Sequence, residues 1–315
     1  SLQLIGNALN GQQLHAILQH FKPHADTRLA YPVCVEMLDG PQLESELASL
    51  SQTELVEWVR MRCRGWSPEP LRLSVKEGQR PYAQPRKSYS VQAGLVKSME
   101  YALQLQVEKG YMEECSYRQG MFVSQGFVQV KSGRFFAGTD LQMVRLLADC
   151  RALNSACHDA PLHHLDCAPS QLDMCSRVPF GSKYFKFYDL SDAFHTCPIH
   201  KDCLDLVVVQ FNGKFYRYLG GAQGIANMAL HWNAHIMDAF DRILGEHWRD
   251  WYTLYCDDMG VHGMSRQQTE NRARVLEAML TVLEKPFSDK TKSDVDTSLD
   301  IAGLHFTEHG VRLSD

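Results

Sequence analysis

The sequence has no long hydrophobic run and no excess of basic charge. Its strongest apolar stretch, LDLVVVQF at 204–211, has the length of a strand and is too short to cross a bilayer. No signal peptide or membrane span is visible, so we expect an intracellular protein, cytoplasmic or nuclear. The formal net charge is −5, whereas nucleic-acid-binding proteins usually carry a basic excess. An acidic metal site would add negative charge of its own, so this balance decides neither for nor against a nucleic-acid partner.

The ten cysteines lack the spacing of a disulfide framework. Cysteines and histidines between residues 150 and 175 come nearest to a zinc motif, but this group has no CxxC pair and no matching HxxxH. Scattered, reduced cysteines are the preferred interpretation over a zinc site. Internal repeats and low-complexity tracts are also absent. A chain of 315 residues with ordinary apolar and charged fractions can nevertheless bury a large core.

Hydrophobic periodicity predicts helices in the first part of the chain. Apolar residues recur at helical spacing within 1–65, with Ser51 or Thr53 as a cap, and GWSPEP at 65–70 marks a boundary. A basic, proline-interrupted connector follows at 77–88. Further helices are expected over about 91–109, 226–244 and 266–284, with Gly245 ending the second of these.

Strand patterns dominate after residue 120. In GMFVSQGFVQVKSGRFF, two β-rich runs flank KSG and predict a hairpin, and the NG at 212–213 is a strong signal for another. KYFKFYDL at 183–190 is an aromatic strand ending in an acid, and LYCDDMGVHG at 254–263 has the pattern strand, acidic turn, strand. LDIAGLHF, EHG and VRL close the chain with one more hairpin. The layout predicts an α+β fold with helices packed on an antiparallel sheet.

The adjacent acids Asp257 and Asp258 stand in the turn of that acidic hairpin. Aspartate is a common turn residue, and this bland interpretation suffices for the pair alone. Asp189, at the end of another strand, changes the balance because acids at the ends of adjacent strands converge and repel each other without a cation. Magnesium relieves that repulsion, and two ions roughly 4 Å apart can clamp the attacking and leaving oxygens of phosphoryl transfer. The acids therefore suggest metal-assisted nucleotidyl transfer.

The order of several motifs resembles one known family. YFKFYDLSDAFHTCPIH, GAQGIANMALHWNAHI, YCDD and GLHFTEHG resemble the palm of a reverse transcriptase, most closely that of the gypsy-type retrotransposon and retroviral branch. VRLLADCRALN resembles the fingers segment of that branch, and the likeness covers roughly 71–315 in collinear order. The resemblance implies an α+β right-hand polymerase fold with fingers and palm, an antiparallel palm sheet packed on helices, and no thumb in this chain.

This resemblance also implies a division of the chain and an activity. The expected parts are a helical extension of unknown role at 1–70, mainly fingers at 71–182, mainly palm with the catalytic acids at 183–300, and a primer-grip hairpin at 301–315. The expected activity is RNA-directed DNA polymerisation, with two Mg²⁺ ions (or Mn²⁺) and transfer of deoxynucleotides to a primer 3′-hydroxyl. The expected partners are an RNA or DNA template with its primer, deoxynucleotides and, through 1–70, another protein; no membrane partner is expected.

Catalytic roles carry over from the family motifs to four residues. Asp189 and Asp257 would bind the metal ions, and Asp258 would lie close to the metals and the primer end. Lys290, in PFSDKTK, matches the lysine that protonates the departing pyrophosphate. A solvated surface lysine is an equally good interpretation of Lys290.

Nucleotide-binding roles carry over to residues of both the palm and the fingers. Asp192 would lie near the triphosphate, and Phe194 falls at the steric-gate position, where an aromatic ring collides with a ribose 2′-hydroxyl. Gln223 and Gly224 would help hold the template and the nucleotide. An ordinary core aromatic is the other interpretation of Phe194.

Two basic residues and one hairpin complete the carried-over site. Arg145 matches the fingers arginine that contacts the triphosphate, a use suited to its forked, permanently charged side chain, although a solvated surface arginine is the alternative. Lys131 is the candidate fingertip lysine. The motif GLHF would grip the primer strand through Gly303, Leu304 and His305.

Three departures from the family pattern keep other functions open. Ala222 replaces the proline before QG, the fingertip is poor in lysine, and the sequence ends at Asp315 without the thumb. A domesticated relative that acts as a nucleic-acid-binding or protein scaffold is therefore the first alternative. A different phosphoryl-transfer enzyme, such as a nuclease or a terminal transferase, is the second, and template dependence would distinguish it.

Overall fold

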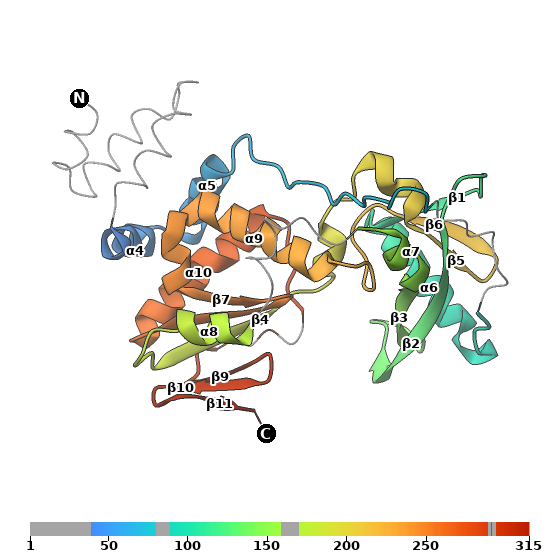
Figure 1. Cartoon of the computed structure of the whole chain (residues 1–315). Coiled ribbons are helices and arrows are strands. Elements are labelled where there is room, and N and C mark those ends of the chain that lie inside the picture. The colour runs from blue at the N-terminus through green and yellow to red at the C-terminus, as the bar shows by residue number, and fades with distance from the viewer. Residues whose placement is uncertain (1–38, 80–88, 159–169, 289–290, 292–293, 315) are drawn as a thin grey trace. The chain divides into compact units, whose positions relative to one another are not determined.

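The computed structural model describes residues 39–79, 89–158, 170–288, 291 and 294–314 (Figure 1). The helix predicted from NALNGQQLHAILQHF, most of the basic connector and Lys290 lie outside these residues. The chain divides into two compact units that are interleaved in sequence. The first comprises Ser1–Ser67, Pro169–Ser191 and Asn233–Asp315, and the second comprises Pro68–Ala168 and Asp192–Trp232.

The first unit contains two three-stranded antiparallel sheets and most of the helices. One sheet has the order β4-β8-β7, and the other has the order β11-β10-β9. Its strands are β4 (Tyr184–Asp189), β7 (Tyr252–Tyr255), β8 (Asp258–Gly263), β9 (Ser298–Ile301), β10 (Leu304–Thr307) and β11 (Gly310–Leu313). Its helical segments are α4 (Gly40–Ser49), α5 (Gln52–Arg62), α8 (Gln171–Arg177), most of α9 (Met228–Leu244), η6 (Gly245–Asp250) and α10 (Arg266–Val282).

The two faces of β4 pack against different elements. Successive strand residues point to opposite faces, so Phe185, Phe187 and Asp189 share one face while Lys186 and Tyr188 share the other. Phe185 belongs to a core cluster with residues of β9 and β10, whereas Lys186 and Tyr188 both contact Glu277 of α10. The β9–β11 sheet therefore covers the face of β4 that carries Asp189, and α10 covers the opposite face.

The second unit is built on one mixed sheet of order β1-β6-β5-β2-β3. All neighbouring strands are antiparallel except β2 and β5, which are parallel. The strands are β1 (Met112–Cys115), β2 (Val123–Phe135), β3 (Gln142–Asp149), β5 (Val208–Phe211) and β6 (Lys214–Tyr218). The helical segments are η2 (Ala93–Leu95), α6 (Val96–Glu108), α7 (Arg151–Ala156), η4 (Ala193–Thr196) and η5 (Lys201–Leu206).

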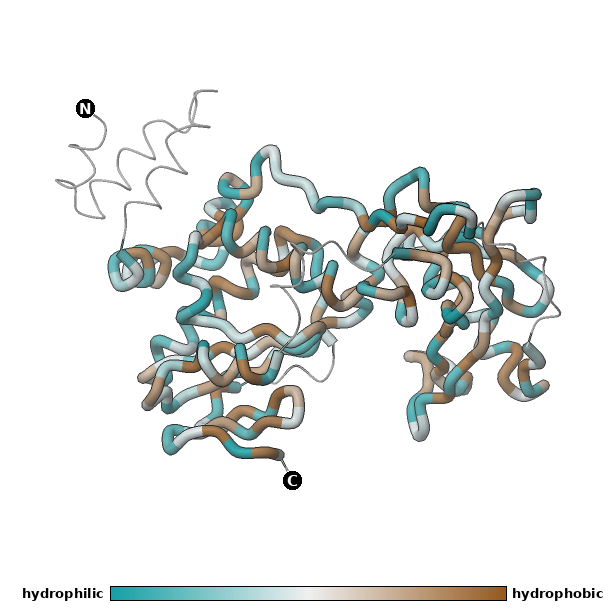
Figure 2. Tube along the Cα trace, in the orientation of Figure 1, coloured by the Kyte–Doolittle hydropathy of each residue, from teal (hydrophilic) through white to brown (hydrophobic). Residues whose placement is uncertain are grey.

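Local sequence signals explain where many of these elements begin and end. Ser51 caps α5 in a capping box with Glu54, in which each side chain satisfies a backbone N–H of the other residue. Gly245 takes the left-handed conformation after α9, with φ 62°, as expected for a helix end. Hydrophobic and hydrophilic positions alternate along the helices of the first unit (Figure 2), which is the pattern of helices with one buried face. In the described part of the chain, no helix combines the length and the apolar character that a bilayer crossing requires.

The α+β fold with a palm sheet packed on helices is confirmed, and three local predictions are wrong. LDIAGLHF is not one arm of a single closing hairpin, because Ala302 and Gly303 form a turn between β9 and β10. KSG is not a turn: β2 continues through it to Phe135, and the chain reverses between Phe136 and Leu141. Gly133 has φ 68°, and the register with β3 shifts between Val130 and Phe135, so the glycine belongs to an irregularity within a strand. The predicted strand at 204–211 begins only at Val208, because the 3-10 segment η5 runs up to Leu206.

Candidate active site

The acidic hairpin β7–β8 forms as a tight two-residue turn. Tyr255 pairs with Asp258, which leaves Cys256 and Asp257 as the turn residues, and Cys256 adopts a left-handed φ of 55°. On the other side of β8, Asp258 pairs directly with Asp189 at the end of β4. Residues opposite each other in an antiparallel pair share one face, with Cβ atoms about 5 Å apart. Two acids that are 69 positions apart in sequence (258 − 189) are therefore neighbours on one face.

Asp189 is held by hydrogen bonds from the segment that follows α10. It is a buried residue whose carboxylate accepts a hydrogen bond from the Ser288 hydroxyl. The Ser288 N–H donates to the Asp189 carbonyl (2.8 Å). Thr291 Oγ1 accepts from the Asp189 N–H (3.1 Å) and donates to its carbonyl oxygen (3.0 Å). The N–H of Leu190 donates to the carbonyl of Asp257 (3.0 Å), so the backbones beside the acids are tied together as well.

Asp189, Asp257 and Asp258 together are called the acidic corner below. The negative charge of the last two affects the pKa of the neighbouring Cys256 thiol in the turn. Burial raises the pKa of the Cys256 thiol to about 11, and the negative charges of Asp257 and Asp258 act in the same direction. Cys256 is therefore a protonated, unreactive thiol at neutral pH. The same negative potential would attract cations to the turn.

The donor set is compatible with a hard divalent cation. In the parts of the chain that the structure describes, no group of three or more His, Cys, Asp or Glu side chains is arranged as a ready-made metal site. Magnesium, however, commonly takes only one or two protein carboxylates and completes its shell with water and substrate phosphates. The paired Asp189 and Asp258, with Asp257 in the adjacent turn, provide carboxylates of this kind.

The predicted primer-grip residues lie in the same unit as the acids. Ala302 and Gly303 form the two-residue turn between β9 and β10, both with positive φ (51° and 77°), and the carbonyl of Ala302 accepts a hydrogen bond from Gln171 (2.6 Å). Leu304 is buried, while Nδ1 of His305 lies 2.8 Å from the carboxylate of Asp300.

Gly260 lets the β9–β11 sheet approach the strand that carries Asp258. A Cβ atom at this glycine would lie 2.7 Å from Leu299 of β9 and 2.5 Å from Thr253 Oγ1 of β7. No real Cβ contact is that short, so only glycine allows the two sheets to pack this closely. The turn that bears Gly303 is therefore fixed within the same packed unit as the acidic corner.

The predicted nucleotide-side residues of the palm lie together in the second unit. The Gly220–Gly221 backbone packs tightly against η4, because a Cβ on Gly220 would lie 1.9 Å from the His195 carbonyl oxygen. A Cβ on Gly221 would lie 2.8 Å from the carbonyl oxygen of Phe194. Ala222, in the place of the family proline, is buried, whereas the following Gln223 and Gly224 are exposed. Phe194 is partly buried.

Sequence reasoning gave no role to Asn154, which holds this loop in place. Its amide donates to the carbonyl of Gly224 (2.7 Å), and its side-chain oxygen accepts from the N–H of Ala226 (2.9 Å). Gly224 has a positive φ of 97°, and a Cβ atom there would lie 3.2 Å from the carbonyl oxygen of Ala148. The asparagine that ends DCRALN was the available signal, since its short amide can bond to backbone on both sides.

Asp192 has a cationic partner that the sequence patterns did not indicate. Nζ of Lys109 lies 2.6 Å from the Asp192 carboxylate, and Asp192 itself has a left-handed φ of 52°. Next to this pair, the rings of Tyr111 and His195 stack with centroids 5.4 Å apart. Burial lowers the pKa of His195, so this ring is neutral beside the ion pair.

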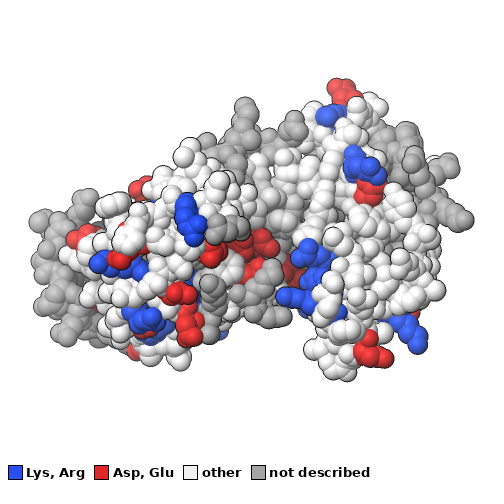
Figure 3. All heavy atoms as spheres, turned by 90° about the horizontal axis from the view of Figure 1, so that it is seen from below, with Lys and Arg blue, Asp and Glu red and all other residues white. Residues whose placement is uncertain are grey.

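The two candidate basic residues of the fingers lie on the β2–β3 hairpin. Arg145 is exposed on β3 opposite Gln129, and within the described residues its guanidinium has no hydrogen-bond or ion-pair partner. Lys131 is partly buried on β2, where the register irregularity begins. On the face drawn in Figure 3, basic and acidic side chains are interspersed, in keeping with the mild net charge.

Comparison with known proteins identifies the family. A family model described as reverse transcriptase (RNA-dependent DNA polymerase) matches residues 131–293, which is more than half of the chain. No curated protein was found to match the sequence.

Solved structures with a similar fold include the prototype foamy virus protease–reverse transcriptase in its native form. Its TM-score is 0.56 and its sequence identity is 16%, and the match covers 76% of this chain and 29% of the viral chain. A foamy viral protease–reverse transcriptase in complex with an RNA/DNA hybrid has a TM-score of 0.60 and 16% identity over 88% of this chain and 36% of that one. The same viral protein with double-stranded DNA has a TM-score of 0.57 and 16% identity, covering 88% and 56%. The chain thus spans little more than half of these proteins at most, and at this identity the likeness concerns the fold. Together with the family match, it establishes that the chain belongs to the reverse transcriptase (RNA-dependent DNA polymerase) family.

Proposed function

We propose that this chain catalyses RNA-directed DNA synthesis by adding deoxynucleotides to the 3′-hydroxyl of a primer. The observation that carries the proposal is the direct pairing of Asp189 with Asp258 beside Asp257 in a two-residue turn. A merely structural turn would explain Asp257 and Asp258 but gives no reason to place a third acid opposite them on the same face. Family membership supplies the reaction class for this acidic corner.

Asp189, Asp257 and Asp258 would hold two Mg²⁺ ions, with Mn²⁺ as a substitute. Bound ions of this kind stabilise the attacking and leaving oxygens of an in-line phosphoryl transfer. The protein's own contribution is to fix the carboxylates before substrate binds. Ser288 and Thr291 fix Asp189 through four hydrogen bonds, which supports a preorganised site.

The remaining roles in the proposal belong to nucleotide selection and binding. Phe194 would exclude a ribose 2′-hydroxyl, and Asp192, with Lys109 beside it, would lie near the triphosphate. Gln223 and Gly224 would contact the template and nucleotide, supported by the rigid attachment of their loop to Asn154.

Basic and primer-side groups complete the proposed machinery. Arg145 would contact the triphosphate, which its exposure without an ion-pair partner in the described residues supports. Lys131 would act at the fingertip and Lys290 as the proton donor to pyrophosphate. Gly303, Leu304 and His305 would grip the primer strand.

We further place the chain in the gypsy-type retrotransposon and retroviral branch, on the order of its DLSDAF, QG and YCDD motifs. The proposed division is an extension at 1–70 that contacts a protein partner, mainly fingers at 71–182, mainly palm at 183–300 and the primer-grip hairpin at 301–315. The proposed nucleic-acid partner is a template–primer duplex of RNA or DNA.

Primer extension on an RNA template tests the proposal. The wild-type chain, Asp257→Asn and the control Asp202→Asn, an exposed acid of η5, are compared with Mg²⁺ and deoxynucleotides. Extension by the wild type and the control, reduced at least 100-fold in Asp257→Asn, is the expected result. No extension by the wild type on a primer–template that it demonstrably binds would contradict the proposal and favour a scaffold role. Extension that ignores the template sequence would instead indicate a terminal transferase.

A further inference from the structure

We propose that helices α4 and α5 form a clamp on α10 that positions the acid-bearing strands, and that Glu44 is its positioning residue. Residues 40–62 are described in these two helices, within the extension that the family motifs do not cover. The positioning role rests on the proposed polymerase function, whereas the mechanical role of the clamp does not.

The clamp contacts α10 through a forked ion pair. Arg272 donates from Nε to one carboxylate oxygen of Glu44 (2.6 Å) and from Nη2 to the other (3.0 Å). Gln268 adds a third hydrogen bond to Glu44 (3.1 Å). The side chains of Glu44 and Arg272 are only 17% and 10% exposed, so solvent screens this pair weakly.

Further contacts extend the interface between the clamp and α10. Gln52 donates to the carbonyl of Arg274 (3.3 Å), and the guanidinium of Arg274 donates back to the carbonyl of Leu50. Leu55 and Val59 of α5 are fully buried within the first unit. The clamp is therefore an integrated layer of the unit that contains the acids.

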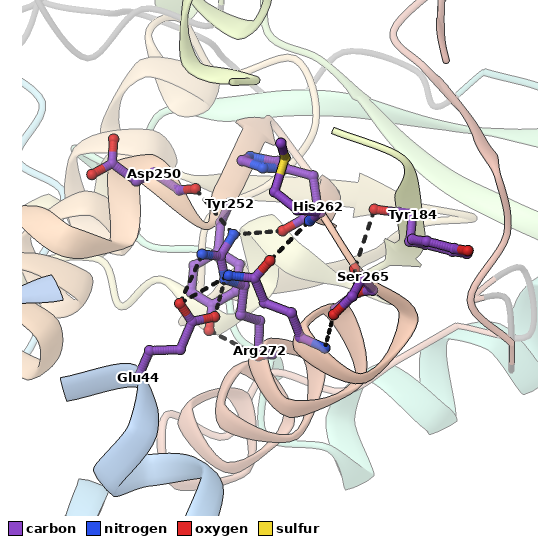
Figure 4. A network of polar contacts seen from close by, with 10 residues as sticks. Glu44, Tyr184, Asp250, Tyr252, His262, Ser265 and Arg272 are labelled. Carbon is purple, nitrogen blue, oxygen red and sulfur yellow. Dashed lines mark hydrogen bonds and ion pairs between the residues drawn. The ribbon is translucent and has the colours of Figure 1, made fainter. Parts of the chain in front are cut away.

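The guanidinium that Glu44 holds also fastens the far end of the acidic hairpin. Nη1 of Arg272 donates to the carbonyl of His262 (2.7 Å), near the end of β8, and to that of Asp250 (3.4 Å), just before β7. The Tyr252 hydroxyl in turn donates to the carbonyl of Arg272 (2.9 Å). Figure 4 shows Glu44 on one side of the guanidinium and the hairpin backbone on the other. One side chain thus joins α4, α10 and both ends of the β7–β8 hairpin.

The same helix holds the other acid strand through Glu277. Its carboxylate accepts hydrogen bonds from the Tyr188 hydroxyl (2.6 Å) and from Nζ of Lys186 (3.0 Å). Burial and the charge of Glu277 raise the pKa of Tyr188, so its hydroxyl stays protonated and donates. Tyr188 directly precedes Asp189. α10 therefore sets the relative placement of β4 and β8, and the clamp holds α10.

Loss of the Glu44 charge should release this arrangement. Glutamine presents one acceptor where the guanidinium needs two, and it leaves the charge of Arg272 without a buried counter-ion. Arg272 then gains by turning toward water, which removes the hydrogen bond to His262. The hydrogen bonds between β8 and its neighbouring strands then weaken, first near His262. As a result, the pairing of Asp258 with Asp189 becomes less well defined.

Amide hydrogen exchange of the full chain tests the mechanical part of the proposal. Glu44→Gln should accelerate exchange in residues 258–263 on the order of 10-fold. The matched control Glu57→Gln removes an exposed ion pair with Arg60 on α5 and should leave that exchange unchanged. Glu44→Asp keeps the charge with a shorter reach and should fall between them, and it serves as the test variant if Glu44→Gln does not fold. Equal exchange in 258–263 for wild type and the Glu44 variants would overturn the clamp.

Primer-extension kinetics test the positioning part. Glu44→Gln should lower kcat about 10-fold, leave KM for the deoxynucleotide within about 2-fold and raise the Mg²⁺ concentration at half-maximal rate, with Glu44→Asp partly restoring all three. Faster exchange together with unchanged kcat and Mg²⁺ dependence would overturn the positioning role. A wild type that shows the expected exchange pattern but no extension would count against the proposed function and leave the clamp standing.

Discussion

Lowering the pH from 7 to 5 should destabilise the protein through His262, a buried histidine of β8. Its side chain has no exposed surface, and within the described residues neither ring nitrogen has a hydrogen-bond partner. Burial, reinforced by the positive charge of Arg272, lowers the pKa of His262 from 6.5 to about 3. The folded protein therefore keeps this ring neutral at pH 5, whereas the unfolded chain binds a proton there.

The size of the effect follows from proton linkage. Between the unfolded pKa of 6.5 and the folded pKa of about 3, the unfolded state binds more protons, so the free energy of unfolding falls as the pH falls. One pKa unit corresponds to about 1.4 kcal/mol, which gives a loss of about 2 kcal/mol between pH 7 and pH 5. For a domain of ordinary size this lowers Tm by about 4–8 °C. His195 has a lowered pKa as well and acts in the same direction, so a variant is needed to isolate His262.

Urea unfolding of wild type and His262→Leu at pH 5, 6 and 7, followed by tryptophan fluorescence, measures this contribution. The leucine loses no hydrogen bond, so stability at pH 7 should be equal or higher. The loss between pH 7 and pH 5 should shrink by about 2 kcal/mol. His309→Leu, at a position where the side chain is 87% exposed, should keep the wild-type pH dependence. An identical pH dependence of wild type and His262→Leu would refute the reasoning.

Three further predictions concern the candidate site. Phe194→Ala should raise ribonucleotide incorporation relative to deoxynucleotide about 10- to 200-fold in single-nucleotide extension, and an unchanged ratio would contradict its role as a steric gate. Gly221→Ala places a Cβ 2.2 Å from Met228 Sδ and should cost about 1–3 kcal/mol in urea unfolding, whereas Gly94→Ala, with open space around it, should cost far less. Cys256 has a pKa of about 11, so its thiol should react with iodoacetamide at pH 8 about 100-fold more slowly than an ordinary thiol. Peptide mass spectrometry measures this rate, and labelling at the ordinary rate would contradict the burial of Cys256 beside the acids.

Local patterns predicted the elements of the fold well wherever one short segment decides the outcome. The helices near 96–108, 228–244 and 266–282 and the hairpin at Asn212–Gly213 follow from apolar periodicity and turn chemistry. The predicted turn at KSG was wrong because a glycine with positive φ occurs in strand irregularities as well as in turns. Only the pairing with β3 decides between these two structures. The interleaving of the two units has no local signal, because it depends on contacts across more than 200 residues.

The sequence predicted the acids of the candidate site better than the polar residues that hold the site in place. Asp189 and the acidic turn stand at strand ends, where the apolar pattern makes a charged residue conspicuous. Asn154, Lys109 and Glu44 are polar residues in or beside helices, where such residues usually face solvent. Their hydrogen bonds to distant segments become visible only when the segments are packed together.

The clamp also has a consequence for synthesis of the chain. Glu44 and Arg272 are separated by 228 positions, and the other partners of α4 and α5 lie similarly far downstream. At about 5–20 residues per second, the ribosome takes roughly 10–45 s to make the intervening chain. During that time the apolar faces of α4 and α5, with Leu43, Leu47, Leu55 and Val59, have no α10 to cover them. The nascent chain therefore exposes these apolar faces to aggregation and chaperone capture until α10 has emerged.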